Sequence, residues 1–377
     1  MKRFITRFLT VSLAIIFAVL ATGCVPPTIL SFNNNFAGGK DPSELTGGTK
    51  PYVETLIYDV EYVEKYDGIS KSSTVSTPTP KYNGTFTSTF TDTVVKENIP
   101  NSDISSNADF SNGNIYYLKT ALDLTVTADS IEKTYNDMII NEVYFYQSSL
   151  SYAPIWSKTT MKMTSFALSV EGLNPSQDIY QFETIYNTAS YTMTKKIYQK
   201  DKDEDINLVD INEPNWTSEK LKEESSKSPK TYEYTLKTLI DNNQLFFMLR
   251  NLNFMTQQAS NDKIQQYAYL PTVSFAYGQE KTLHIVVENE ETHNFQHDLT
   301  DGTKLDENEQ SSMLVNKISF VLSANEYTGT KKYIKVQKQK TEQYDKALPV
   351  EYAEPLIDQT MTTYGALKYS LKQAIYN

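Results

Sequence analysis

Cys24 is the one residue whose position suggests a defined covalent chemistry. It directly follows three small residues, Ala-Thr-Gly at 21–23, which end the apolar run 8–20. Residues 1–7 carry three basic side chains and no acidic one. A basic start, a short apolar run and small residues are typical of a secretory signal peptide, and the run is shorter than the roughly 20 residues of a membrane-spanning helix. A thiol directly after the cleavage point can be alkylated by a diacylglyceryl group.

This segment resembles the lipobox of bacterial lipoproteins, in which a branched aliphatic residue, a small residue and Gly or Ala precede the cysteine. It departs mildly from that pattern, because Ala21 stands where leucine is usual and Leu20 lies one place earlier. The resemblance implies lipidation of Cys24, with palmitate among the acyl chains, and a membrane anchor at the extracytoplasmic face of the cell membrane. The alternative is an ordinary signal peptide with a chance cysteine, which is less favoured because the chain has no other cysteine.

Composition excludes several classes of protein. The chain has 46 Asp and Glu against 35 Lys and Arg, and its net charge of −11 argues against a nucleic-acid partner. Removal of Lys2, Arg3 and Arg7 with the leader would make it three units more negative. A single cysteine rules out a disulfide framework. An aromatic content of 12% is too high for a disordered chain.

Two histidines beside acidic residues are the best candidates for a metal site. His293 and His297 are four residues apart, a spacing that would place them on one face of a helix. No glutamate stands between them as in the HExxH zinc motif, and the surroundings are polar. Residues 298–309 offer oxygen ligands without EF-hand spacing. The sequence therefore favours a solvated loop with no metal. The acids that precede the histidines are Glu288, Glu290 and Glu291.

The remaining candidates for chemistry are less specific. The sequence has no GxSxG, P-loop or Rossmann motif and no cysteine nucleophile in the body, so we predict no cofactor and favour a protein that is not an enzyme. Paired carboxylates for glycoside hydrolysis stay open, because 46 acidic residues always offer pairs. Arg250 could be the buried partner of a carboxylate, or could extend from a helix to solvent. His284 alternates with apolar neighbours and is expected on a sheet face.

The elements that must position these residues are mostly strands. In 56–62, Tyr58, Val60 and Tyr62 share one face. The Asn-Gly dipeptide in 82–84 predicts a turn, and 241–254 predicts a helix with Asp241 as N-cap and leucines at helical spacing. Further strands are expected at 85–91, 115–127, 143–146, 161–170, 180–186, 191–198, 232–239, 267–277, 282–288, 315–322, 332–338, 349–352 and 364–373.

The chain then divides into a leader (1–23), a flexible tether (24–51), a first β-rich half (52–200), a charged linker or insertion (201–230) and a second β-rich half (231–377). The second half is either separate or continuous with the first in one sheet. An acidic loop is expected at 289–312. This pattern predicts a mainly antiparallel β fold, all-β or α+β, built as a curved sheet, half-barrel or sandwich with one or two helices.

Residues 241–372 are similar to an uncharacterised family of periplasmic β-rich proteins, which in turn resembles the half-barrel lipid carriers LolA and LolB. The resemblance implies a concave sheet wrapped on a helix and an apolar ligand, and it carries over no catalytic residue. The matching segments are Asp241, Leu249-Arg250, Val273 to Phe275, Leu283 to Val287, Tyr333 to Val336, Leu348-Pro349-Val350 and Leu367 to Leu371.

We therefore expect a lipid-anchored extracytoplasmic protein of the cell envelope that binds an apolar ligand or a partner protein. The alternatives are an anchored hydrolase acting on cell-wall or sugar substrates, and a structural subunit of an envelope complex. A groove lined by Phe and Tyr would favour ligand carriage, and a cleft with two carboxylates would favour the hydrolase.

Overall fold

The computed structural model describes residues 53–377 apart from 67–68, 71–79, 93, 95–97, 101–114, 129–130, 148–151, 170–171, 188, 200–229, 234–238, 251–265, 274–279, 307–310, 324–331, 338–347 and 358–362. Cys24, the leader, the tether and nearly all of the charged segment 201–230 lie outside the described residues. In the part that is described, no helix is long and apolar enough to span a membrane.

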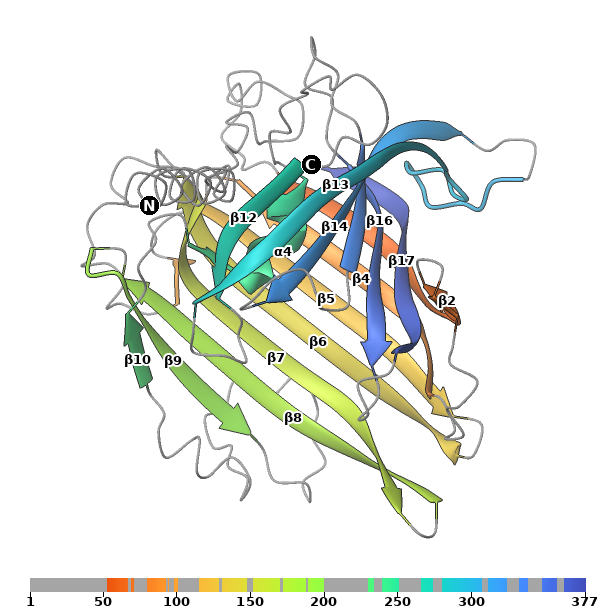
Figure 1. Ribbon diagram of the computed structural model, residues 1–377, viewed down its shortest axis with the longest axis horizontal. Helices are drawn as coiled ribbons and strands as arrows, with labels where there is room; N and C mark the ends of the chain where they lie inside the picture. Colours follow the sequence, from red (N-terminus) through yellow and green to blue (C-terminus); the bar gives the residue numbers. More distant parts are fainter. Residues whose placement is uncertain are drawn as a thin grey trace, which may run out of the picture.

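Within the described residues, fifteen strands form one sheet, in the order β10-β9-β8-β7-β6-β5-β4-β1-β17-β16-β15-β14-β13-β12-β11. Figure 1 shows this sheet. Neighbouring strands are antiparallel, except for the short parallel pair β11 and β12. The predicted antiparallel β class is confirmed.

The first strands along the chain are β1 (Val53–Val63), β4 (Pro80–Thr91), β5 (Ile115–Ala128), β6 (Ile131–Gln147), β7 (Tyr152–Ser169), β8 (Gly172–Asn187), β9 (Thr192–Gln199) and β10 (Lys230–Glu233). The later ones are β11 (Ile240–Asp241), β12 (Gln266–Val273), β13 (Glu280–Asn294), β14 (Ser312–Ser323), β15 (Lys332–Gln337), β16 (Pro349–Ile357) and β17 (Thr363–Tyr376). A separate two-stranded ribbon joins β2 (Lys65–Tyr66) and β3 (Ile69–Ser70).

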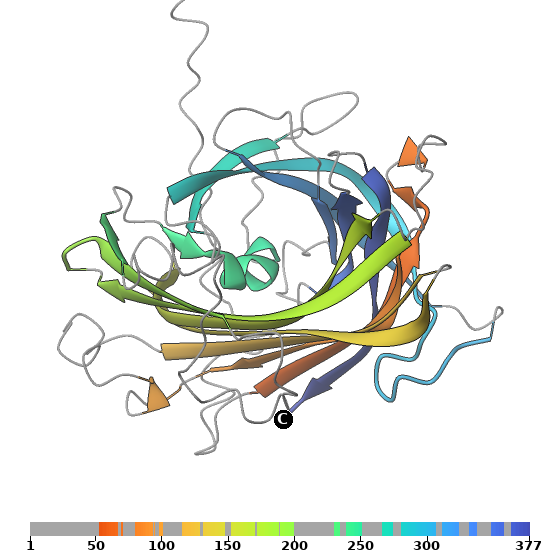
Figure 2. The same ribbon diagram turned by 90° about the horizontal axis from the view of Figure 1, so that it is seen from below.

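Alternation along the strands decides which face is buried. In β5, Leu118, Leu122 and Leu124 are buried, whereas Lys119 and Asp123 between them are exposed. Successive side chains of a strand point to opposite faces, so this pattern gives the sheet one apolar face. The sheet curls around that face and around the short helix α4 (Leu245–Leu249), as Figure 2 shows. The curved antiparallel sheet with a short helix agrees with the predicted fold class.

The sheet has two arms, which are strands β10 to β4 on one side of β1 and strands β17 to β11 on the other. The helix α4 packs between these two arms in the core. Phe247 of α4 stacks on Phe90 of β4 with ring centroids 4.4 Å apart, and Met248 shares the same apolar cluster. Ile285 of β13 and Ile334 of β15 complete this cluster from the other arm. Burying these side chains drives the curling, since each contributes about 1.5–3 kcal/mol when removed from water.

Asp241 begins the helical segment, as predicted. Its carboxylate accepts a hydrogen bond from the backbone N–H of Asn243, and the Gln244 side chain accepts one from the backbone N–H of Asp241. This reciprocal capping box starts the 3₁₀ turn η5 (Asn242–Gln244), which leads into α4. Arg250 ends α4 as its C-cap, and residues 251–254 of the predicted helix lie outside the described ones.

Two predictions about loops are wrong. Residues 82–84 do not form a turn but lie inside β4, where a Cβ on Gly84 would come within 1.9 Å of the Asp123 carbonyl oxygen. Glycine is thus needed at position 84 because the backbones of β4 and β5 approach each other closely there, and not because the chain turns. The acidic segment 289–312 is also not all loop, because β13 continues to Asn294 and pairs with the start of β14. Its charged side chains are tolerated in a strand because none of those from Glu288 to Glu291 that the structure describes is fully buried.

Candidate functional site

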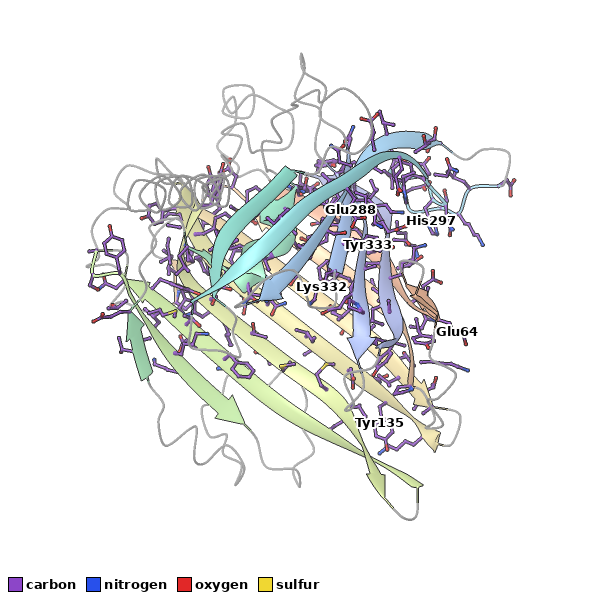
Figure 3. The ribbon with its side chains drawn as sticks, in the orientation of Figure 1. Glu64, Tyr135, Glu288, His297, Lys332 and Tyr333 are labelled. Carbon is purple, nitrogen blue, oxygen red and sulfur yellow. The ribbon has the colours of Figure 1, made fainter. Side chains whose placement is uncertain are left out.

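A cluster of charged side chains lies on the outer face of β13 to β17. In β15, Ile334 and Val336 are buried in the core, so Tyr333 and Lys335 take the opposite, outward face. Glu351 of β16 is paired in register with Lys335 and shares this face. Figure 3 shows Glu288, Tyr333 and Glu64 in this part of the molecule.

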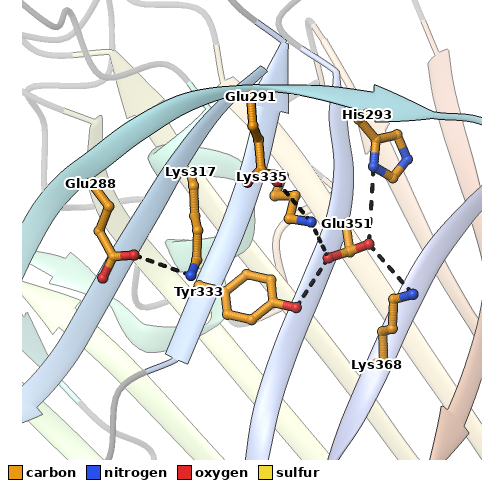
Figure 4. A network of polar contacts seen from close by, with 8 residues as sticks. All are labelled: Glu288, Glu291, His293, Lys317, Tyr333, Lys335, Glu351 and Lys368. Atoms are coloured by element: carbon orange, nitrogen blue, oxygen red, sulfur yellow. Dashed lines mark hydrogen bonds and ion pairs between the residues drawn. The ribbon is translucent and has the colours of Figure 1, made fainter. Parts of the chain in front are cut away.

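Glu351 is the centre of the cluster (Figure 4). Its carboxylate lies 2.8 Å from the Lys335 ammonium, 3.6 Å from that of Lys368 and 4.0 Å from Nδ1 of His293, and it accepts a 3.0 Å hydrogen bond from the Tyr333 hydroxyl. Glu351 is only 5% exposed. Burial acts to raise the pKa of this carboxyl, but Lys335 and Lys368 outweigh burial and hold the pKa below its usual value. Glu351 is therefore a firmly ionised anion.

Lys335 connects Glu351 to a second carboxylate. Its ammonium also lies 2.8 Å from Glu291. Burial lowers the pKa of Lys335, yet the two carboxylates more than compensate, and the pKa is raised. A neighbouring pair, Lys317 and Glu288 at 3.1 Å, extends the charged strip across β13 and β14. Both lysines also lie near the ring of Tyr333, at 4.8 and 5.7 Å from its centroid.

The two histidines considered for a metal site do not face each other on a helix. His293 is in strand β13, against Glu351, whereas His297 follows in a loop, with Nε2 3.6 Å from Asp59. Burial lowers the pKa of His293, and Lys335 and Lys368 act in the same direction against the pull of Glu351. Among the described residues, no group of three or more His, Cys, Asp or Glu could hold a metal ion.

An open hollow of about 640 Å³ lies beside the cluster. Ala353, on the outward face of β16, lines the hollow and is only 1% exposed. The hollow thus combines apolar and charged surface, the usual composition of a site that orients a small ligand. Its lining consists of Val63, Glu64, Tyr333, Lys335, Glu351, Ala353 and Lys368.

Sequence reasoning missed the residues around Glu351. The alternation of 332–338 predicted a strand, but the partners of its outward charges depend on β15 lying beside β16, and β16 beside β17. For Arg250, the structure decides between the two alternatives, because its guanidinium pairs with buried Glu54 at 2.6 Å. Asp241 was predicted only as a cap, yet it also accepts hydrogen bonds from Ser157 and Tyr186. His284 is in β13, as expected for a sheet residue.

The fold and the cluster define a curved antiparallel β protein with a charged hollow on its outer face. No family model matches the chain, and no curated protein matches it. Among solved structures it is similar to a "Beta-barrel-like Protein of Domain of Unknown Function DUF1849" from Brucella abortus. The identity is 9% and the TM-score 0.38, over 88% of this chain and 100% of the other. A likeness of this degree defines neither a family nor a function.

Proposed function

We propose that this chain is a lipid-anchored extracytoplasmic binding protein that is not an enzyme, and that its ligand is a small charged molecule bound in the outer hollow. The observation that carries the proposal is the hollow itself, in which a buried, ionised Glu351 lies between two lysines and a tyrosine hydroxyl. Such a preset arrangement of charges costs little reorganisation when a ligand of complementary charge binds.

The charge states of the cluster argue for binding rather than catalysis. A general acid needs a raised carboxyl pKa and a general base or amine nucleophile needs an accessible neutral form. Glu351 has a lowered pKa, and Lys335 has a raised one. Both groups are held in their charged forms near neutral pH, so the cluster favours electrostatic recognition over hydrolysis.

The inside of the curl offers less support for an apolar ligand. There α4 inserts Phe247, Met248 and Leu249 among buried residues of both arms of the sheet. The protein's own helix thus packs against the apolar face that a lipid carrier would present to its cargo. We therefore take the outer hollow, rather than the concave face, as the ligand site.

Binding is tested by thermal unfolding in the presence of representative amino acids, short peptides, sugars and fatty acids. The Tm with each compound is measured for the wild type and for the Ala353→Leu variant. The larger side chain partly fills the hollow, and Lys368→Met provides a second, more conservative change at its rim. We expect a charged ligand to raise the Tm of the wild type and to lose that effect in both variants. A fatty acid that raises the Tm of all three proteins equally would contradict the proposal, as would the absence of any stabilising ligand.

The anchor is tested separately with Cys24→Ser in a bacterial host. We expect the wild type to incorporate labelled palmitate and to fractionate with membranes, and the variant to do neither. Palmitate in the variant protein would place the lipid elsewhere and overturn the proposed anchor.

A further inference from the structure

The residues that line the hollow form three rows on the outward face of β15, β16, β17 and β1. In register across the sheet, Lys335 lies opposite Glu351, Tyr333 opposite Ala353, and Ala353 opposite Lys368. Val63 of β1 lies opposite Ala366, one step further along the same outward face. Residues on one face repeat about every 6.8 Å, so these three rows cover about 14 Å. The site therefore has room for an extended ligand along the strands.

Two places along the hollow differ in the charge that they can offer. Glu64 is exposed at the Val63 end, and no ion pair or hydrogen bond of its side chain occurs within the described part of the chain. In the middle row, the side chain of Lys368 is 28% exposed, and its contact with Glu351, in the row beyond, is 3.6 Å long. Lys335 is more fully engaged, with two carboxylates at 2.8 Å. An incoming cation is thus attracted to Glu64 and an incoming anion to Lys368.

The surface between the two charges is apolar and shallow. Ala353 and Val63 belong to one small apolar cluster, against which the Tyr333 ring packs. A methyl-bearing chain fits against such a surface, while a large side chain would be pushed out to solvent. The ligand body is therefore small and aliphatic.

We propose that the hollow binds a short zwitterionic peptide with small side chains, whose terminal ammonium pairs with Glu64 and whose terminal carboxylate pairs with Lys368. This inference rests on the proposed function and names the ligand class for the same site. The row of Lys368 lies one step, about 6.8 Å, from the row of Val63. An extended chain adds at most about 3.3–3.6 Å per residue, so two or three residues cover that interval. Charges at both ends fix the direction of the peptide, because the reversed peptide would place like charges together.

The experiment is a calorimetric titration of the full chain with tri-alanine, its N-acetylated form and its C-terminal amide. We expect tri-alanine to bind, and Glu64→Gln and Lys368→Met each to weaken binding about tenfold. We expect the wild type to bind the acetylated peptide as weakly as the Glu64→Gln variant binds tri-alanine. The Glu64→Gln variant should bind the acetylated peptide no more weakly than the wild type does. Likewise, the wild type should bind the C-terminal amide as weakly as the Lys368→Met variant binds tri-alanine, and that variant should bind the amide no more weakly than the wild type does.

The matched controls are Glu233→Gln on β10 and Lys119→Met on β5, two exposed residues on the other arm of the sheet, and they should bind tri-alanine as the wild type does. Equal binding of all three peptides, or unchanged binding by both hollow variants, would overturn the zwitterion assignment. If tri-alanine does not bind but another charged ligand loses its effect in Ala353→Leu, the peptide class is wrong and the proposed function stands. If no ligand of any class binds, both are wrong.

Discussion

Arg250 and Glu54 are 196 residues apart in sequence and form an ion pair of 2.6 Å inside the curled sheet. Arg250 is the C-cap of α4, and Glu54 is near the start of β1, the strand that joins the two arms. The guanidinium also lies over the ring of Phe247, 4.7 Å from its centroid. This pair therefore ties the helix to the middle of the sheet.

Removing one partner of this pair should be strongly destabilising. In Arg250→Met the Glu54 carboxylate remains buried without its counter-charge, and we expect the free energy of unfolding to fall by about 3–5 kcal/mol. The measurement is urea unfolding monitored by circular dichroism at pH 7. The double variant Glu54→Met with Arg250→Met should recover most of the loss, because no buried charge remains. A single variant as stable as the wild type would show that the pair is unimportant for folding.

Asp241, in the edge strand β11, connects one end of the curled sheet to strands β7 and β8. Its Oδ2 accepts hydrogen bonds from Ser157 of β7 and Tyr186 of β8, and its Oδ1 from the backbone of Asn243. We expect Asp241→Asn to lower the free energy of unfolding by about 3 kcal/mol, because an amide cannot accept all of these bonds. Asp123→Asn, an exposed aspartate on β5, serves as the control and should change it by less than about 0.5 kcal/mol. Equal effects of the two substitutions would contradict a role of Asp241 in closure.

The sequence predicts the strands well because their signal is local. The alternation of Tyr58 and Val60 requires no knowledge of β17, the neighbour of β1, and the N-cap at Asp241 depends only on the next three residues. The same locality misleads at Gly84, where a turn dipeptide occurs inside a strand. There the need for glycine comes from the carbonyl of Asp123, which belongs to another strand.

The site depends on non-local pairing and was therefore not predictable. Lys335, Glu351 and Lys368 lie on three different strands, and a shift of one residue in any register would turn one of them to the core. The charge signal that the sequence did show, around His293, marks the edge of this cluster rather than its centre. Residue types alone could not identify Glu351 as the carboxylate that three basic side chains share.

Gly84→Ala tests the close approach of β4 and β5. The added Cβ would meet the carbonyl oxygen of Asp123 at 1.9 Å, so the two backbones must separate, and we expect a loss of about 3 kcal/mol in the free energy of unfolding. Gly302→Ala is a useful comparison, because its cost arises from a positive φ of 76° and not from a clash, and should be about 1 kcal/mol. Chemical denaturation of both variants measures the difference. A smaller loss for Gly84→Ala than for Gly302→Ala would contradict the close packing of these strands.

Lys195 should make the stability of the protein rise with pH between about 8 and 10. It is 5% exposed and lies beside Thr184 in the register of β8 and β9. Burial lowers the pKa of Lys195 to about 8, against the opposing attraction of Asp241. In the unfolded chain a lysine titrates near 10.4, so between these values the unfolded state binds more protons and stability increases with pH. Below pH 8 both states are protonated, and the penalty of the buried charge is fully present.

We expect this group to add about 2 kcal/mol to the free energy of unfolding between pH 7.5 and 9.5. Buried tyrosines act with the opposite sign, because burial raises the pKa of Tyr58 and Tyr369 above the ordinary value and stability is then lost as pH rises above about 10. The measurement is therefore urea unfolding at half-unit steps up to pH 9.5. Lys195→Met should remove the rise, whereas Lys119→Met, an exposed lysine on β5, should retain it. Parallel curves for the wild type and Lys195→Met would mean that the buried ammonium does not titrate in this range.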